Sequence, residues 1–179
     1  MKASKKAVIL VGHGGLPSNI TPEIVENFMR VHKTRIKAGG PITEREVELD
    51  SIIRNWERTP ENDPYKSGLE SLASHMKPML KDYLVKTAYN EFCYPAIEDA
   101  VDELVKENIS KIIIVTTMIT RGGSHSENEI PEELQALRQK HSDIEIEYAW
   151  PFSIDAFALF LTDHIKNYNP TAKVSSDKE

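Results

Sequence analysis

The stretch Lys6–Gly15, "KAVILVGHGG", decides the fold that the sequence predicts. Its first part, Ala7–Val11, is continuously apolar and rich in β-branched residues, as is typical of a strand buried on both faces of a parallel sheet. Glycines follow at once and surround a single histidine, His13. They leave the backbone open to close approach by a large, flat molecule. The stretch therefore predicts a central strand with a candidate site at its carboxyl end.

Three more segments have the character of strands. Ile112–Val115 repeats the continuous apolar pattern and predicts a second central strand, buried on both faces. Ile144–Trp150 alternates apolar and polar residues, which suits a sheet edge, and Tyr83–Tyr89 is a weaker strand pattern. Helical patterns lie between these segments. We therefore expect an α/β fold, a four-stranded parallel sheet flanked by helices in a flavodoxin-like layering.

Helical periodicity is clearest in the second half of the chain. Pro95–Glu107 carries an apolar stripe with a proline in its first turn, and Pro131 opens another helix whose first turn is acidic. Ser153 can cap a last helix that runs to about Lys166. We expect this helix to face the core through Phe157, Leu161 and Ile165.

Residues 17–82 are too many for one crossover between strands. A helix is predicted between Thr21 and Gly40, and a capping box at Thr43 opens a second that reaches about Trp56. A third is expected over Tyr65–Lys81, with a kink at Pro78. The sequence thus predicts a helical insertion after the first strand, at about residues 17–82.

Length and charge limit the function classes. The 179 residues suit one domain, which we place at residues 1–170 with a flexible tail at 171–179. A net charge of −6 argues against electrostatic binding to nucleic acid or to an anionic membrane, and no apolar run is long enough to span a bilayer. The single cysteine, Cys93, excludes an intramolecular disulfide and fits a cytoplasmic protein.

Three candidate ligands follow three different strands. His13 follows the first strand, Glu91 the second and His125 the third. The carboxyl ends of parallel strands share one edge of the sheet, so these side chains are expected to meet there. Two imidazoles and a carboxylate can hold a divalent transition metal and leave a position open, which is the pattern of a catalytic site. Glu129 either orients His125 or caps a helix.

Other interpretations remain open. His13 alone is also consistent with a hydrogen-bonding turn residue, or with a phosphoryl-accepting nucleophile, although the arginine expected beside such a histidine is missing. Cys93 is expected to pack in the core. The remaining histidines are expected at the surface: His32, His75, His141 and His164. Five arginines form either a solvated face or a positive rim for an acidic substrate: Arg30, Arg35, Arg54, Arg58 and Arg121.

The segments "VILVGHGG" (8–15), "NEFCYPAIEDAVDEL" (90–104) and "KIIIVTTMITRGGSHSENEIP" (111–131) resemble the type II chelatases. These are the small, ATP-independent cobaltochelatases and ferrochelatases of the CbiX and CbiK kind, which act on sirohydrochlorin. The resemblance covers roughly residues 6–15 and 83–167. Glu129 stands where the family usually has aspartate before Ile-Pro.

The resemblance implies roles for individual residues. His13 would bind the metal and accept pyrrole protons, and Glu91 and His125 would complete the metal site. The tetrapyrrole would contact Gly14, Gly15, Arg121, Gly122 and Ser124. The metal is a substrate, Co²⁺ or alternatively Fe²⁺ or Ni²⁺, and no ATP or other nucleotide is expected. The short form of the family implies a homodimer. A non-catalytic carrier of metal or tetrapyrrole is the alternative.

Overall fold

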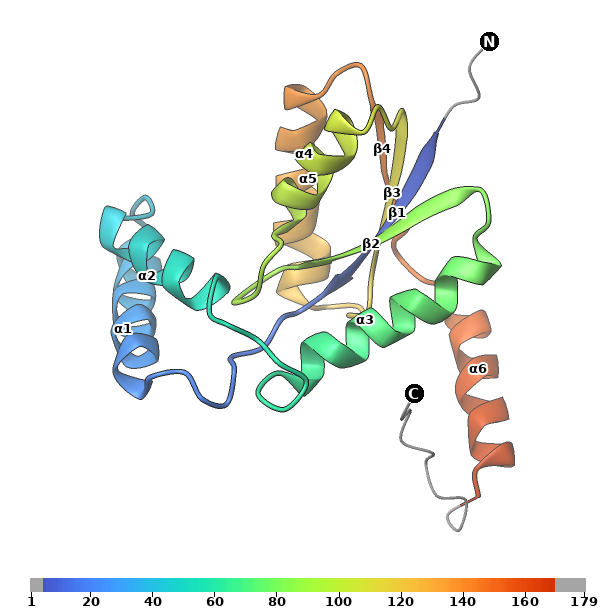
Figure 1. Cartoon of the computed structure of the whole chain (residues 1–179), viewed down its shortest axis with the longest axis horizontal. Helices are drawn as coiled ribbons and strands as arrows, with labels where there is room; N and C mark the ends of the chain where they lie inside the picture. The colour runs from blue at the N-terminus through green and yellow to red at the C-terminus, as the bar shows by residue number, and fades with distance from the viewer. Residues whose placement is uncertain (1–4, 170–179) are drawn as a thin grey trace.

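The computed structural model describes residues 5–169. Four parallel strands form one sheet in the order β2-β1-β3-β4 (Figure 1). Their bounds are Lys6–Gly12 (β1), Tyr83–Tyr89 (β2), Lys111–Thr116 (β3) and Glu145–Tyr148 (β4). The predicted sheet is confirmed, with β1 and β3 central and β4 at an edge. The tail expected at 171–179 lies outside the described residues.

The two central strands differ in burial. β1 is buried from Ala7 to Gly12, as predicted. In β3 the residues alternate: Ile112 and Ile114 are buried, whereas Ile113 is half-buried. The prediction of burial on both faces is therefore wrong for β3. On that face the neighbouring apolar cluster packs over β1 and β2 and reaches only Val115 of β3.

Two helices cover one face of the sheet. These are α4 (Ile97–Lys106) and α5 (Ile130–Lys140) (Figure 1). The apolar stripe of α4 is buried as expected, and it packs with the sheet residues and with α5 in one large core. Residues of this core include Ile9, Val11, Val101, Leu104, Ile112, Ile114 and Leu134.

On the opposite face lies α3 (Pro64–Met76), which packs against the sheet through Leu69 and Ala73. The side chain of Asp63 caps this helix by accepting from the backbone N–H of Lys66, 2.9 Å away. The prediction that Pro78 kinks the helix is wrong. The α-helix ends at Met76, and Pro78 lies in a 3₁₀ turn, η1 (Lys77–Met79), because proline cannot donate to the helical ladder.

The additional helices, α1 (Pro22–Ala38) and α2 (Glu44–Arg54), form a hairpin beyond the carboxyl end of β1 (Figure 1). Gly39, with φ 64°, ends α1, and the Thr43 side chain caps α2 as the capping box predicted. The hairpin has a small core of its own: Ile20, Phe28, Leu49 and Ile53. Since α3 packs on the sheet as a crossover helix, only α1 and α2 of the predicted insertion stand apart from the layers.

The last helix, α6 (Ile154–Asn167), departs from expectation. Ser153 caps it as predicted, accepting from the backbone N–H of Ala156. The prediction that its apolar residues face the core is wrong: Leu161 is 42% exposed and Ile165 72% exposed, and no α6 residue is buried. Figure 1 shows α6 standing away from the sheet. Sequence periodicity reports that a helix has an apolar face but not what that face contacts.

None of the helices within residues 5–169 combines the length and the apolar character needed to cross a membrane.

Candidate metal centre

His13 lies in the loop that follows β1, where hydrogen bonds hold both its backbone and its ring. Its backbone N–H donates to the hydroxyl oxygen of Tyr65, 2.7 Å away. Its ring Nδ1 is 2.8 Å from the carbonyl oxygen of Gly14. A carbonyl oxygen only accepts, so Nδ1 carries the ring proton and Nε2 keeps a free lone pair. This tautomer is the one a metal ligand needs.

Glu91 lies in the loop after β2, and this loop interlocks with that of His13. The backbone N–H of Glu91 donates to the carbonyl oxygen of His13 at 2.8 Å, and the N–H of Asn90 donates to that of Gly12 at 2.9 Å. Gly14 has φ +94°, and a Cβ there would overlap the carbonyl oxygen of Glu91. Glycine is therefore required at this close approach of two backbones.

His125 opens a single π-helical turn, η2 (His125–Glu129), just before α5. Such turns occur frequently at functional sites. Nδ1 of His125 lies 2.8 Å from Oε2 of Glu129, whose other oxygen accepts from the Ser124 hydroxyl at 2.9 Å. Partial burial opposes ionisation of Glu129, but the bonds from His125 and Ser124 prevail and lower its pKa. An ionised carboxylate only accepts, so the shorter contact, with Glu129, favours the tautomer with the proton on Nδ1 and Nε2 free. Nδ2 of Asn90, a donor, lies 3.0 Å from the same Nδ1.

Glu129 makes no capping hydrogen bond to α5. Two roles were predicted for Glu129, orienting His125 or capping a helix. Its contacts favour the first.

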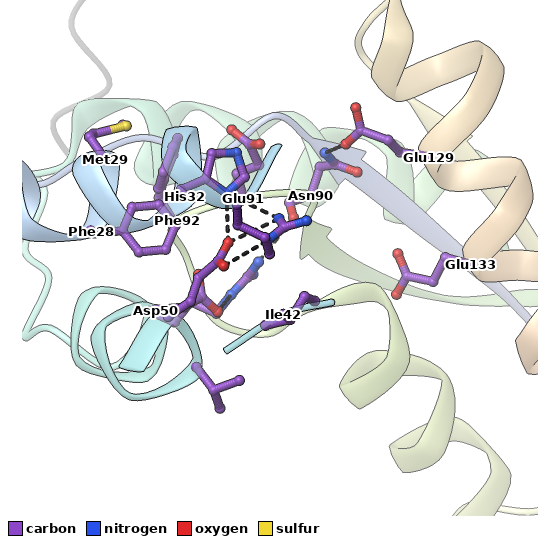
Figure 2. Close-up of a pocket in the computed structure, with 14 residues that line it drawn as sticks. Phe28, Met29, His32, Ile42, Asp50, Asn90, Glu91, Phe92, Glu129 and Glu133 are labelled. Carbon is purple, nitrogen blue, oxygen red and sulfur yellow. Dashed lines mark hydrogen bonds and ion pairs between the residues drawn. The ribbon is translucent and has the colours of Figure 1, made fainter. Parts of the chain in front are cut away.

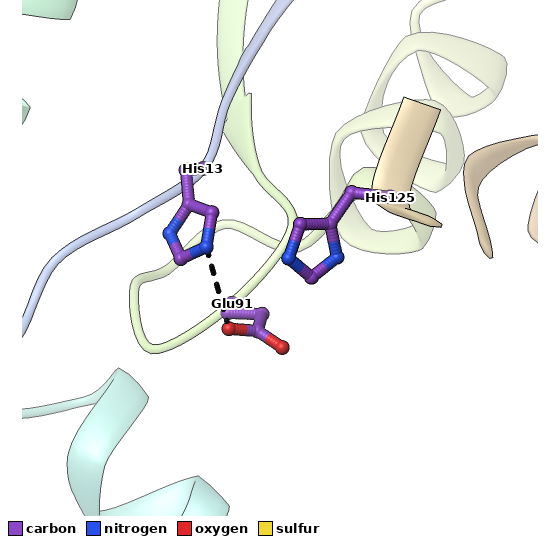
Figure 3. Close-up of side chains that lie close together, drawn as sticks. All are labelled: His13, Glu91 and His125. Atoms are coloured by element: carbon purple, nitrogen blue, oxygen red, sulfur yellow. Dashed lines mark ion pairs between the residues drawn. The ribbon is translucent and has the colours of Figure 1, made fainter. Parts of the chain in front are cut away.

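The three side chains form one cluster, with one ligand atom of each lying within 4.8 Å of the others (Figure 3). Nε2 of His13 is 3.7 Å from Oε2 of Glu91. The rings of His13 and His125 are nearly perpendicular, with centroids 4.9 Å apart. All three residues are half-buried, so one side of the cluster stays accessible to a second molecule. Two imidazoles and one carboxylate in this arrangement can hold a borderline divalent cation.

Arg58 connects the two interlocked loops. Its guanidinium donates to the carbonyl oxygen of Gly15 at 2.8 Å, to that of Phe92, and to the carboxylate of Asp63. Its side chain is only 6% exposed. Phe92 has φ 58°, an unfavourable backbone conformation that its neighbours must maintain. The bond from Arg58 to the Phe92 carbonyl supplies such a restraint directly beside Glu91.

Arg54, at the end of α2, holds the same loop from another side. It donates to the carbonyl oxygens of Asn90 and Cys93, both at 3.1 Å. The sequence could not predict these contacts, because their acceptors are backbone carbonyls and every residue has one. The idea that Arg58 belongs to a positive rim is wrong, since its guanidinium is buried among protein acceptors.

A cavity of about 480 Å³ opens beside Glu91, between the α1–α2 hairpin and α5 (Figure 2). Its walls carry two arginines, Arg35 and Arg54, and each is ion-paired with a protein carboxylate, Glu46 or Asp50. The lining contains five carboxylates in all: Glu46, Asp50, Glu91, Glu129 and Glu133. The expected positive rim is therefore not present here, and the charge of the lining favours a cation.

The other residues predicted to contact the tetrapyrrole have different surroundings. Gly15 is tied to Arg58, and Ser124 to Glu129. Gly122, with φ +86°, has open space around it. Arg121 is exposed and lines a separate groove against α6, not the cavity beside Glu91.

The remaining residues singled out in the sequence have structural contacts. Cys93 is buried as expected, and burial raises the pKa of its thiol to about 11. The surface assignment is wrong for His141, which bonds to Asp102 at 2.7 Å with only 14% of its side chain exposed. His32 bonds to Glu46 at 2.8 Å and keeps 35% of its side chain exposed. His75 and His164 are exposed.

Part of this chain is similar in sequence to a known protein. A sirohydrochlorin ferrochelatase from Priestia megaterium is 26% identical over 70 residues, which make up 39% of this chain and 26% of that protein. This chain thus matches about a quarter of the length of that relative.

Solved structures share the fold at low identity. The sirohydrochlorin chelatase SirB from Bacillus subtilis subspecies spizizenii, in complex with cobalt, superposes with a TM-score of 0.52 and 19% identity, over 89% of this chain and 49% of that one. A putative cobalamin (vitamin B12) biosynthesis CbiX protein from Marinobacter aquaeolei superposes with a TM-score of 0.55 and 15% identity. The match covers 90% of this chain and 94% of that one. These likenesses bear on the fold alone.

A family model gives the most direct assignment. The CbiX model matches residues 61–164, a range that includes Glu91, His125 and Glu129. Because this match extends over more than half of the chain, the protein belongs to the CbiX family.

Proposed function

We propose that this protein is an ATP-independent chelatase that inserts a divalent metal into sirohydrochlorin or a closely related tetrapyrrole. The observation that carries the proposal is the meeting of His13, Glu91 and His125 at the carboxyl edge of the sheet in a CbiX family chain. The names of the relatives, a ferrochelatase and a cobalt-bound chelatase, support the same substrate class.

The proposed reaction needs a metal site that releases its ion. Three protein ligands, half-buried and open on one side, hold a cation less firmly than a closed four-ligand site. The acidic lining of the neighbouring cavity would concentrate divalent cations beside Glu91. Both features support a metal that passes through the site as a substrate.

Metal insertion also requires two N–H protons to leave the ring. Nε2 of His13 has a free lone pair, so the imidazole suits a proton acceptor. The same lone pair cannot hold a metal and a proton together. We infer that His13 accepts one of the two protons after it has released the metal to the ring nitrogens, and that the other proton leaves to water through the open side of the cluster.

The choice of metal and pathway extends the proposal. We infer Co²⁺ or Fe²⁺ as the metal, with Ni²⁺ as an alternative, and a role in cobalamin or siroheme biosynthesis. Solved structures of similar chelatases contain cobalt or Fe³⁺. Ligand softness does not make a site of two histidines and one glutamate selective among Co²⁺, Fe²⁺ and Ni²⁺. We further propose a cytoplasmic homodimer that uses no nucleotide.

An anaerobic assay with sirohydrochlorin, Co²⁺ and substoichiometric protein tests the function. We expect multiple turnovers in the absorption spectrum, faster than without protein, and their loss in His13→Ala and His125→Ala. His75→Ala is the matched control, because His75 is exposed on α3 and bonds only to the Ser71 carbonyl. Stoichiometric binding of metal or tetrapyrrole without turnover would instead establish the carrier.

The phosphohydrolase interpretation makes a different prediction, a phosphate group trapped on His13. Nε2 of His13 faces the Glu91 carboxylate, which would repel an incoming phosphate. This contact favours the chelatase.

A further inference from the structure

An apolar stripe runs along α6 without a partner in the described part of the chain. Its residues recur at helical spacing and so share one face of the helix: Ile154, Phe157, Ala158, Leu161 and Ile165. Ile154 and Ile165 are each 72% exposed, and no residue of α6 is buried. An exposed apolar face of this kind marks an interaction surface in a soluble protein.

The amino-terminal half of this stripe forms one wall of a groove of about 290 Å³. The opposite wall is the loop after β3, which contributes Ile119, Thr120 and Arg121. The groove contains Ile154, Phe157 and Leu161 but not Ile165, which lies further along α6. The stripe therefore has two unlike halves, a grooved one and a projecting one.

We propose that α6 pairs with α6 of a second copy of this chain, antiparallel across a two-fold axis. In that arrangement the projecting half of each helix lies over the grooved half of the other. Ile165 of one copy would then occupy the groove of its partner, and the partner would do the same in return. This self-complementarity is the property that an isologous dimer interface requires.

The charges of α6 favour the antiparallel direction. The first turn carries Asp155 and the last turn Lys166, and both lie on the same flank of the stripe. Within residues 5–169 neither forms an ion pair. Antiparallel pairing brings Asp155 of one copy opposite Lys166 of the other and also opposes the two helix dipoles. Parallel pairing would place this flank of one copy against the opposite flank of the other, so Asp155 and Lys166 would not meet.

The pairing also reaches the candidate metal centre. The loop that forms the far wall of the groove continues from Arg121 to His125. A partner helix seated in the groove would therefore restrain the loop that carries one of the three proposed ligands. The pairing would supply the surface for the proposed homodimer, and it depends on α6 and the loop that faces it, not on the proposed metal chemistry.

Sedimentation velocity over a range of concentrations tests the surface. We expect a dimer for the unaltered chain. Leu161→Glu should raise the dimer Kd about 100-fold, because a symmetric interface loses the side chain twice. Leu159→Glu is the matched control: Leu159 is 71% exposed on α6 but lies outside the stripe, so its dimer should persist.

A charge exchange tests the direction of pairing. Asp155→Lys and Lys166→Asp should each weaken the dimer, and the double variant should restore it. The proposal is overturned if the unaltered chain is monomeric up to its solubility limit, if Leu161→Glu leaves the dimer intact, or if both leucine variants dissociate it equally. A Co²⁺ titration of each variant reports on the metal centre separately, so failure of one proposal is distinguishable from failure of the other.

Discussion

The α-carbon of Gly14 lies so close to the carbonyl oxygen of Glu91 that no side chain fits between them. Gly14 also has φ +94°, a conformation that side chains disfavour. The two loops that carry His13 and Glu91 can therefore interlock only if this position is glycine. The requirement links a local feature of the sequence to the geometry of the proposed metal centre.

Gly14→Ala should separate the His13 and Glu91 loops. We expect metal-insertion activity to fall about 100-fold, because displacing a reacting group by about 1 Å has effects of that size. The Co²⁺ affinity should fall as well. Gly39→Ala is the control, since Gly39 also has positive φ but has no atoms within 4 Å of the added methyl group. Equal Co²⁺ affinity in the two variants would contradict the argument.

Glu129→Gln should weaken metal binding without touching a proposed ligand. The amide oxygen of glutamine can still accept from Nδ1 of His125, but without the negative charge that favours this tautomer and raises the basicity of Nε2. Losing such a partner typically lowers metal affinity about 10- to 100-fold. Isothermal titration with Co²⁺ measures the change. Glu132→Gln, an exposed position in the first turn of α5, should bind as the unaltered chain does. An unchanged affinity in Glu129→Gln would show that His125 needs no such orientation.

The sequence predicted the strands and the meeting of three side chains because both depend on local features. A continuous apolar run such as Ala7–Val11 predicts a central strand, and the carboxyl ends of parallel strands lie at one edge of the sheet. The contacts of Arg58 could not be predicted in this way. Its acceptors are backbone carbonyls of Gly15 and Phe92, far apart in sequence and without any residue signature.

The same limit explains the two errors of burial. Ile113 of β3 and Leu161 of α6 are apolar residues in regular elements, and periodicity assigned both to a core. Whether a given face is covered depends on which other elements pack there. On this side of the sheet α3 lies over β1 and β2, and α6 stands away from it (Figure 1).

Arg58→Lys should destabilise the protein and loosen the site together. Lysine keeps the charge near Asp63 but cannot reach both carbonyl acceptors, so at least one of them loses its Arg58 donor. We expect the free energy of unfolding in urea to fall by about 2 kcal/mol. Arg30→Lys is the control, because Arg30 is exposed and, among the described residues, its guanidinium bonds only to Asn27 on the same helix. Equal unfolding midpoints for the two variants would exclude a structural role for Arg58.

Acid should selectively loosen the α1–α2 hairpin through Glu46. Its carboxylate is 5% exposed and accepts from Arg35 at 2.6 Å and from His32 at 2.8 Å. The bond from Arg35 holds its pKa below the usual value, with a smaller contribution from His32, against the effect of burial. The folded pKa is thus below the unfolded one. The associated stability is present above the unfolded pKa of about 4.3 and is lost as pH falls through the folded pKa.

Glu46→Gln removes this contribution at every pH. We expect the variant to unfold more easily than the unaltered chain by about 1–2 kcal/mol at neutral pH, and the difference to shrink as the pH is lowered below about 4. Urea unfolding between neutral and acid pH, followed by tryptophan fluorescence, measures the difference; Trp56 packs against the core of the hairpin. Glu48→Gln is the control, since Glu48 lies on the same helix with its side chain 60% exposed. A difference for Glu46→Gln that stayed constant with pH would mean that packing, and not the charge of Glu46, joins the two helices.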